Sequence, residues 1–409
     1  MANLAGGGGI DAQVALTFLV FLIAFGSLHL ALRQWAPRAS YYLLPLVAVL
    51  TAVGLTMVYR LDPERAGLQR WWLLIAAGLA VGLLFAVRST GLEPLRRYRY
   101  LLLLGALLLL LLPLLPADWS LPLKGKTVNG SRLWIEFAAG PVGIQFQPGE
   151  IAKLLLVVFL ASYLAERHTV LASGTRQIGR LRFVEPRQLV PVLLAWVASF
   201  GVLVYQRDLG ASLLLFAVFL TLLFMATGRA AYPLIGSGMF VVGAFFAWQA
   251  FSHVERRIVA WLRPFSDFDG AGYQIAQGLF AMGSGSLAGS GVGLGRPELI
   301  PFAQTDFLFA AVGEELGLAG AVVVLCAYAL LAAVGFGVAL RSRDLFRKLL
   351  AAGLTFALGL QTFLIIGGVV RILPLTGITL PFMSYGGSSL VSNMLLIVLL
   401  ARLSHEEPV

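Results

Sequence analysis

Two acidic residues in a short polar stretch are the first candidates for chemistry in this sequence. The stretch begins at Arg263 and reads RPFSDFDGAGYQIAQG, so Asp267 and Asp269 lie two residues apart, just before a Gly-Ala-Gly turn. A carboxylate at such a turn can accept a proton from an attacking hydroxyl group, and desolvation would move its pKa toward the working pH. The same pattern fits a solvated loop with two turn-forming acids, so the surroundings must decide between these interpretations.

Cations and aromatic rings crowd the same segment of the chain. They are Arg256, Arg257, Trp261, Arg263, Phe265, Phe268 and Tyr273. Cations, acids and amphipathic rings at a membrane surface suit a lipid that carries a phosphate head group and a sugar. This composition favours a substrate site over a plain loop.

Membrane-spanning helices must position this stretch. Of the 409 residues, 59% are hydrophobic and 12% are charged, whereas soluble domains carry about 25% charged residues. Long Leu- and Ala-rich runs predict helices, because barrel strands would show about ten residues of alternation. We expect an all-α polytopic bundle with eleven spans, near 12–32, 41–59, 71–87, 100–116, 149–165, 188–206, 209–227, 231–251, 306–340, 347–370 and 379–402.

The distribution of charge predicts the orientation of these spans. The net charge is +10, and its cations cluster in short loops between apolar runs, which fits the positive-inside rule and anionic lipid and argues against nucleic-acid binding. No Lys or Arg precedes Arg33, so we expect the first segment to be a retained helix with its N-terminus outside. Two long loops, about 117–148 and 252–305, then lie on the outer face, and loops of this size tend to be functional. In the second, we expect short interfacial helices broken by glycine.

The sequence offers few soft metal ligands. It has one cysteine, Cys326, and four scattered histidines without HxxH spacing. A disulfide framework and a thiolate zinc site are therefore excluded, and any metal site would have to use oxygen ligands.

Glu150 and Lys153 are charged residues at the start of an apolar segment, in QPGEIAK. They are three residues apart and share a helix face, so they can form an ion pair. Two interpretations remain open: a structural pair that marks the helix start, or a pair that faces a cavity and holds an anionic group of a substrate.

A second group of acids occurs in TDFLFAAVGEELGLAG. Asp306 is expected at a helix start, where it would favour the helix dipole, and Glu314 and Glu315 near the third turn. A glutamate at membrane depth without a local cation needs a partner from another helix, so we expect a structural or site-supporting role. Asp208 is expected to cap the following helix, and the last span, near 379–402, needs only packing to explain its small residues.

Six motifs in this order resemble the SEDS (shape, elongation, division and sporulation) family, which includes the RodA, FtsW and SpoVE peptidoglycan polymerases. The resemblance runs from about Tyr41 to the C-terminus. The motifs are NGSRLWI from Asn129, QPGEIAK from Gln147, QRDLG from Gln206, FSDFDGAGYQIAQ from Phe265, TDFLFAAVGEELGLAG from Thr305 and LPLTGITLPFMSYGGSSL from Leu373. The chain departs from the family pattern at Gly149, Arg207, Phe268, Phe302 and Gln304.

The resemblance implies a ten-helix core at 41–409, preceded by an extra N-terminal transmembrane segment and linker at 1–40. The essential family aspartate lies three residues before the Gly-x-Gly-Tyr turn, which selects Asp267 rather than Asp269. The implied reaction joins lipid II, a disaccharide-pentapeptide on undecaprenyl diphosphate, to a growing glycan strand through an inverted β-1,4 bond. It would occur on the outer face of the bacterial cytoplasmic membrane, with a class B penicillin-binding protein as partner.

The resemblance also suggests residues that would support the site, and competing functions. Cations or a divalent ion such as Mg²⁺ or Mn²⁺ would stabilise the leaving diphosphate. The supporting residues are Arg132, Glu150, Lys153, Arg263, Gln274, Asp306 and Glu314. A lipid II flippase and a small-solute transporter are the alternatives, and both predict critical charges with access from the two faces rather than an indispensable outer acid.

Overall fold

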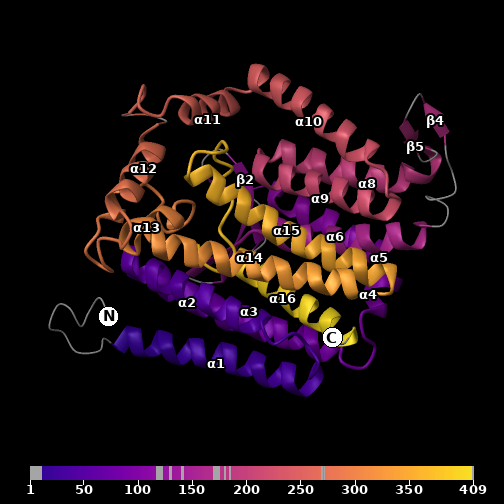
Figure 1. Cartoon of the computed structure of the whole chain (residues 1–409), viewed down its shortest axis with the longest axis horizontal. Helices are drawn as coiled ribbons and strands as arrows, with labels where there is room; N and C mark the ends of the chain where they lie inside the picture. The colour runs from indigo at the N-terminus through magenta and orange to yellow at the C-terminus, as the bar shows by residue number, and fades with distance from the viewer. Residues whose placement is uncertain are drawn as a thin grey trace. The chain divides into compact units, whose positions relative to one another are not determined.

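The computed structural model describes residues 12–116, 123–128, 131–139, 142–168, 176–178, 181–183, 186–268, 270 and 272–407. Helices dominate this part of the chain (Figure 1). They are α1 (Ala12–Trp35), α2 (Leu43–Leu61), α3 (Pro63–Ala86), α4 (Glu93–Arg97), α5 (Arg99–Leu111), α6 (Pro148–Glu166), α8 (Pro186–Tyr205), α9 (Leu209–Thr227), α10 (Ala231–Ala250), α11 (Ser252–Leu262), α12 (Tyr273–Gly285), α13 (Leu308–Glu315), α14 (Gly317–Arg341), α15 (Leu345–Val369) and α16 (Gly387–Glu406), with 3₁₀ turns η1 (Leu112–Leu114) and η2 (Pro297–Leu299).

The predicted helical membrane bundle is confirmed. Among the described residues, nine helices are long and apolar enough to cross a membrane, and two shorter apolar helices cover Arg99–Leu114 and Trp196–Tyr205. These helices occupy the predicted segments, including the extra N-terminal one. The exposed leucine, valine and phenylalanine side chains of α1 and α10 suit a lipid surface.

One predicted span is wrong in its bounds. The segment expected at 306–340 is two helices, because α13 ends at Glu315 and α14 begins at Gly317. Gly317 has a φ of 66°, a left-handed conformation that costs glycine little and commonly ends a helix. Glu314 and Glu315 therefore end a short helix instead of lying in the third turn of a long one.

The chain forms two compact units, and the first contains residues 1–85, 241–334 and 358–397. In it, α1 packs on α2, α13 packs on α2, and α12 packs beside α13 (Figure 1). Two long-range bonds tie distant parts of this unit together: the Arg60 guanidinium donates to the Gly295 carbonyl oxygen, and the Gln69 side-chain N–H donates to that of Ser384.

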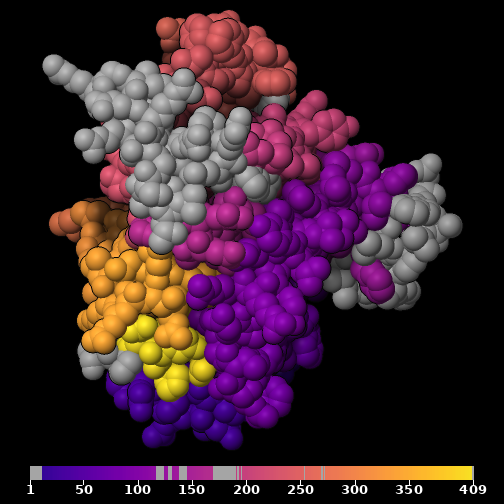
Figure 2. Space-filling model, turned by 90° about the vertical axis from the view of Figure 1, so that its right-hand side faces the viewer, coloured from indigo at the N-terminus to yellow at the C-terminus, as the bar shows by residue number. Residues whose placement is uncertain are grey.

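The second unit contains residues 86–240, 335–357 and 398–409. Its core is built by α5, α6, α8 and α9, and includes Leu110, Leu156, Leu203 and Leu215. At its other end Arg347 contacts Glu406 at 3.0 Å and Glu407 at 3.1 Å. Figure 2 shows this C-terminal end of α16 in yellow, against the orange surface of the α14–α15 connection.

Two small sheets in the second unit were not predicted. The strands β1 (Leu123–Val128), β2 (Ser131–Ala139) and β3 (Val142–Phe146) form an antiparallel sheet in the order β1-β2-β3, and β4 (Arg176–Ile178) pairs with β5 (Leu181–Phe183). Val128 pairs with Ser131, and the sequence between them is Asn-Gly, a dipeptide that strongly favours hairpins. That dipeptide was the available signal for the first sheet.

Candidate functional site

Asp267 lies in a tight turn between α11 and α12. The backbone N–H groups of Gly270 and Gly272 both donate to the Asp267 carbonyl oxygen, at 3.2 and 3.1 Å. The Asp267 side chain is exposed. Asp269, the other acid of the stretch, lies outside the described residues.

Gly272 is required by a close backbone contact within this turn, and Gly270 by the observed place of the Asp267 carboxylate. A Cβ atom at Gly270 would collide with both carboxylate oxygens of Asp267, and one at Gly272 would collide with the carbonyl oxygen of Pro264. The carboxylate is therefore folded back over Gly270. Neither glycine has a positive φ, so the requirement is steric and not conformational.

Aromatic residues precede and follow Asp267 in the chain and form one cluster on α12. Phe265 and Phe268 contact Phe280 of α12, with ring centroids 5.9 and 6.3 Å apart, and Phe268 also meets Tyr273 edge to face at 5.6 Å. Phe265, Phe268 and Phe280 are exposed. This apolar surface can enter a membrane interface and leave Asp267 at its rim. Arg263 is also exposed and ends α11, where its N–H donates to the Val259 carbonyl oxygen.

Gln274 joins the Asp267 turn to the segment that contains Asp306. Its side-chain N–H donates to the Pro301 carbonyl oxygen at 2.8 Å. The same segment is held from the other side, because the Ser384 hydroxyl donates to the Thr305 carbonyl oxygen and the Tyr385 N–H to that of Gln304.

Asp306 is the acid of this region with the most perturbed ionisation. Its side chain retains some accessible surface, but protein atoms crowd it, and this burial raises the pKa of Asp306 to about 6 against the lowering effects of Arg257 and Thr305. Asp306 directly precedes Phe307, the N-cap residue of α13, and no side chain caps that helix end; the favourable effect of Asp306 on the helix dipole stays a prediction. A carboxyl group that titrates near neutral pH is suited to proton transfer or to cation binding.

Glu314 and Glu315 organise the glycine-rich segment before η2. Glu314 accepts from the Arg296 N–H at 2.8 Å, and Glu315 accepts from the Gly293 N–H at 3.1 Å. Glu315 also contacts Arg60 of α2 at 3.3 Å. Arg60 is therefore the expected partner from another helix, and together with Glu315 it fixes the conformation of the glycine-rich segment.

Glu150 and Lys153 form the predicted ion pair, in the second unit. Their Nζ and Oε1 atoms are 2.9 Å apart, and the side chains are 12% and 7% exposed for Lys153 and Glu150. Pro148 occupies the first turn of α6, as expected for a helix start. Arg132 lies on β2 and is exposed, and its Nε donates to the Thr127 hydroxyl at 3.3 Å. Asp208 caps α9 by accepting from the Ala211 N–H at 2.9 Å, as predicted.

The structure thus divides the predicted site residues into two sets. Asp267, Arg263, Gln274, Asp306 and Glu314 belong to the first unit, and Arg132, Glu150 and Lys153 to the second. Sequence reasoning missed Arg60, although a cation in the last turn of an apolar segment is itself a signal.

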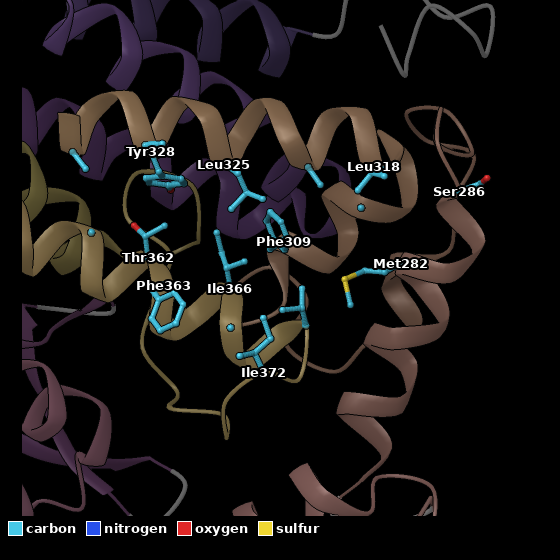
Figure 3. A pocket seen from close by; sticks show the side chains of 17 residues that line it. Met282, Ser286, Phe309, Leu318, Leu325, Tyr328, Thr362, Phe363, Ile366 and Ile372 are labelled. Carbon is cyan, nitrogen blue, oxygen red and sulfur yellow. The ribbon is translucent and has the colours of Figure 1, made fainter. Parts of the chain in front are cut away.

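An apolar cavity of about 530 Å³ lies in the first unit (Figure 3). Tyr328 and Leu325 of α14, Phe363 and Ile366 of α15 and Met282 of α12 line it. Asp267 lines neither this cavity nor a second one of about 390 Å³ beside Trp261 and Arg371.

The described residues contain no group of three or more His, Cys, Asp or Glu side chains arranged to hold a metal. Mg²⁺ commonly binds through one or two carboxylates, with water and substrate phosphates completing its shell. Single acids such as Asp267 or Asp306 are compatible with that mode of binding.

Comparison with known proteins gives consistent matches over nearly the whole chain. The family model of FtsW, RodA and SpoVE, described as cell cycle protein, matches residues 35–408. The chain is 42% identical to peptidoglycan glycosyltransferase RodA of Mycobacterium tuberculosis over 398 residues, which cover 95% of this chain and 82% of the relative. It is 33% identical to the probable peptidoglycan glycosyltransferase FtsW of Geobacter metallireducens over 381 residues, covering 90% and 95%. A solved structure, described as showing the structural coordination of polymerization and crosslinking by a peptidoglycan synthase complex, matches with a TM-score of 0.70 and 27% identity, covering 90% of this chain and 98% of the other.

Proposed function

Because the chain belongs to the SEDS family of FtsW, RodA and SpoVE proteins, we propose that it is a peptidoglycan glycosyltransferase that polymerises lipid II. Asp267 is the general base of this reaction. The carboxylate accepts the proton of the 4-hydroxyl group of the acceptor sugar, whose oxygen attacks the anomeric carbon of the donor strand. The bond from that carbon to the diphosphate breaks, the polyprenyl diphosphate leaves, and the α linkage becomes a β-1,4 bond.

The observation that carries this proposal is the construction of the Asp267 turn. Two glycines make room for the carboxylate and for the backbone around it, and exposed aromatic rings flank it. An exposed acid can meet a bulky sugar acceptor, whereas a buried one cannot. The amphipathic helix α11 leads directly into the turn, which suits an active site at the membrane interface.

Charge stabilisation of the departing diphosphate completes the mechanism. Diphosphate is a good leaving group, so cations matter more than an acid. Arg263 lies four residues before Asp267 in the same turn region and offers a guanidinium group there. A divalent cation bound through substrate phosphates is a further source of positive charge. Gln274 ties the start of α12 to Pro301, and Glu314 binds the Arg296 N–H; we assign Asp306 to the same supporting set.

We place the site on the outer face of the bacterial cytoplasmic membrane. The clustering of cations in short loops and the lack of Lys or Arg before Arg33 support this orientation. The higher identity to the mycobacterial RodA than to the FtsW relative favours a RodA-type role in cell elongation. A class B penicillin-binding protein is the proposed partner, in keeping with the synthase complex that the solved relative represents.

Purified protein, together with its transpeptidase partner, provides the test. Fluorescent lipid II is supplied and glycan strands are resolved on a gel for the wild type, Asp267→Asn and Asp269→Asn. We expect strands from the wild type and from Asp269→Asn, and none from Asp267→Asn. Polymerisation by Asp267→Asn would remove the general base from the proposal. Failure of the wild type to polymerise, with transfer of labelled lipid II across vesicle membranes, would establish a flippase instead.

A further inference from the structure

Arg371 and Trp261 bind each other reciprocally although they are 110 residues apart. The Arg371 guanidinium donates from Nε to the Trp261 carbonyl oxygen at 2.8 Å and from Nη2 to that of Leu262 at 3.0 Å. In return, the Trp261 indole N–H donates to the Arg371 carbonyl oxygen at 3.1 Å. We call these three bonds the Arg371 clamp.

The clamp acts on the end of α11 that leads to Asp267. The last carbonyl groups of a helix lack partners within the helix, and an arginine that binds them also interacts favourably with the helix dipole. Trp261 and Leu262 are the last two residues of α11. The turn that contains Asp267 follows at once, so the direction in which the helix ends sets the position of the turn.

A second attachment joins α11 to the same connection between α15 and α16. Arg257 donates from Nη1 to the carbonyl oxygens of Thr376 at 3.2 Å and Leu375 at 3.4 Å. α11 is therefore held both near its middle and at its end by residues 371–376. Arg257 lies on α11 and Arg371 lies in the connection, so the two sets of bonds form independently of each other.

Side chains cover the end of α11 incompletely. A cavity of about 390 Å³ adjoins the clamp and is lined by Trp261, Leu262, Leu279, Val370 and Arg371. Leu262 is exposed. The end of α11 is therefore incompletely covered by side chains, and the hydrogen bonds of the clamp contribute to its position.

The backbone of Arg371 supports a role for its side chain. Its φ is 63°, a left-handed conformation that is unfavourable for residues with a Cβ atom and natural for glycine. An arginine at such a position is retained at an energetic cost. Strained residues of this kind point to a function for the side chain.

We propose that Arg371 is a positioning residue for Asp267: by clamping the end of α11, it holds the catalytic turn in its productive place. This inference rests on the proposed function of Asp267. Arg371 itself does not touch the substrate. Its loss lets the end of α11 move into the adjoining cavity and misplaces the carboxylate relative to the acceptor hydroxyl.

Arg371→Gly is the sharpest test, because glycine relieves the strained backbone and removes only the two bonds of the clamp that the Arg371 side chain donates. The Arg371 side chain is exposed, so its removal opens no hole in the core. We expect the unfolding temperature to stay the same or rise, the KM for fluorescent lipid II to stay the same, and kcat to fall by about tenfold to a hundredfold. Arg371→Lys keeps the positive charge but lacks the forked guanidinium group, so its kcat should lie between those of the wild type and Arg371→Gly. Trp261→Phe, which removes one of the three bonds, should cause a smaller loss.

Arg343→Gly is the matched control, an exposed arginine in the connection between α14 and α15. It should leave kcat unchanged. Amide hydrogen exchange of residues 259–272 should quicken in Arg371→Gly and not in the control. If Arg371→Gly had the kcat of the wild type, the proposed role of Arg371 would be overturned. A loss of activity that merely follows a fall in unfolding temperature would overturn it as well. Asp267→Asn, run in the same series, separates the two proposals: if it polymerises, the role of Asp267 fails whatever Arg371→Gly does.

Discussion

Arg60, at the end of α2, contacts Glu315, at the end of α13, with Nε and Oε1 3.3 Å apart. The Glu315 side chain is completely buried and that of Arg60 is 24% exposed. The same guanidinium donates to the Gly295 carbonyl oxygen and lies near Glu298. One arginine thus neutralises a buried acid and ties α2 to the glycine-rich segment, 235 residues away in the sequence.

Replacing Arg60 should destabilise the protein strongly. Arg60→Met leaves the Glu315 carboxylate buried without its cation, which typically costs about 3–5 kcal/mol. Thermal unfolding in detergent measures the loss, and Arg60→Met combined with Glu315→Gln should recover much of it. Lys126→Met is the comparison, because Lys126 and Glu136 are both about one-third exposed and such pairs contribute less than about 1 kcal/mol. Equal losses in Arg60→Met and Lys126→Met would contradict this account.

Gly270→Ala should inactivate the enzyme without unfolding it. The new Cβ would collide with the Asp267 carboxylate, which must then turn away from its place, and a misplacement of about 1 Å can cost about a hundredfold in rate. Lipid II polymerisation measures the effect. Gly283→Ala in α12 is the control, because nothing lies within 4 Å of its added Cβ. It should retain activity and gain up to about 1 kcal/mol of helix stability. An active Gly270→Ala would show that the carboxylate can work from another position.

Glu150 and Lys153 can be assigned to structure or to substrate binding by a double variant. Lys153→Met leaves Glu150 buried without its cation and should lower both stability and polymerisation. Adding Glu150→Gln removes the buried charge and should restore the unfolding temperature. We expect polymerisation to stay low in the double variant, because an ammonium that binds an anionic substrate group is still missing. Recovery of both properties would assign the pair to structure alone.

The stability of the protein should depend on pH through Asp306. Its pKa is about 6 in the folded protein and 3.8 without the protein's influence. Between these values the folded state holds a proton that the unfolded state has lost, so stability falls as pH rises through this window. Below about 3.8 the group is neutral in both states, and above about 6 it is ionised in both.

Asp306→Asn should remove that slope. Unfolding temperatures from pH 4 to 7 would show a flatter curve for Asp306→Asn than for the wild type. Glu255→Gln, which alters an exposed acid of α11, should follow the wild type. If the unfolding temperatures of the wild type and Asp306→Asn change with pH in the same way, the Asp306 carboxyl group is not held away from solvent as described.

The orientation can be measured with cysteine labelling. Cys326→Ser removes the one cysteine of the chain, and Ser266→Cys or Arg343→Cys then introduces a single exposed thiol. A membrane-impermeant maleimide should label Ser266→Cys on intact cells and Arg343→Cys only after permeabilisation. The reverse pattern would place the Asp267 turn on the cytoplasmic face and exclude extracytoplasmic polymerisation.

Local patterns predicted much of this molecule. Hydropathy located the spans, the spacing of Glu150 and Lys153 predicted their ion pair, and Asp208 caps α9 as expected. Each of these depends on neighbours within four residues or on a long apolar run, which is the information that a single sequence contains.

Contacts between distant segments could not be predicted in the same way. No spacing rule connects Arg60 to Glu315 or Trp261 to Arg371, because these pairs form only after the helices have packed. The break at Gly317 was hidden within a continuous apolar run, and its signal was the glycine alone. The Asn129-Gly130 hairpin signal was present, but it lay in a chain whose other segments all favoured helices.

Both compact units join early and late parts of the chain. The first combines residues 1–85 with 358–397, where Gly387 packs directly on the Trp72 ring, and the second combines 86–240 with 398–409. During synthesis, the early helices must therefore wait in the bilayer for partners that the ribosome makes last. Truncated nascent chains would leave both units incomplete, and membrane insertases and quality-control proteases would encounter them in that state.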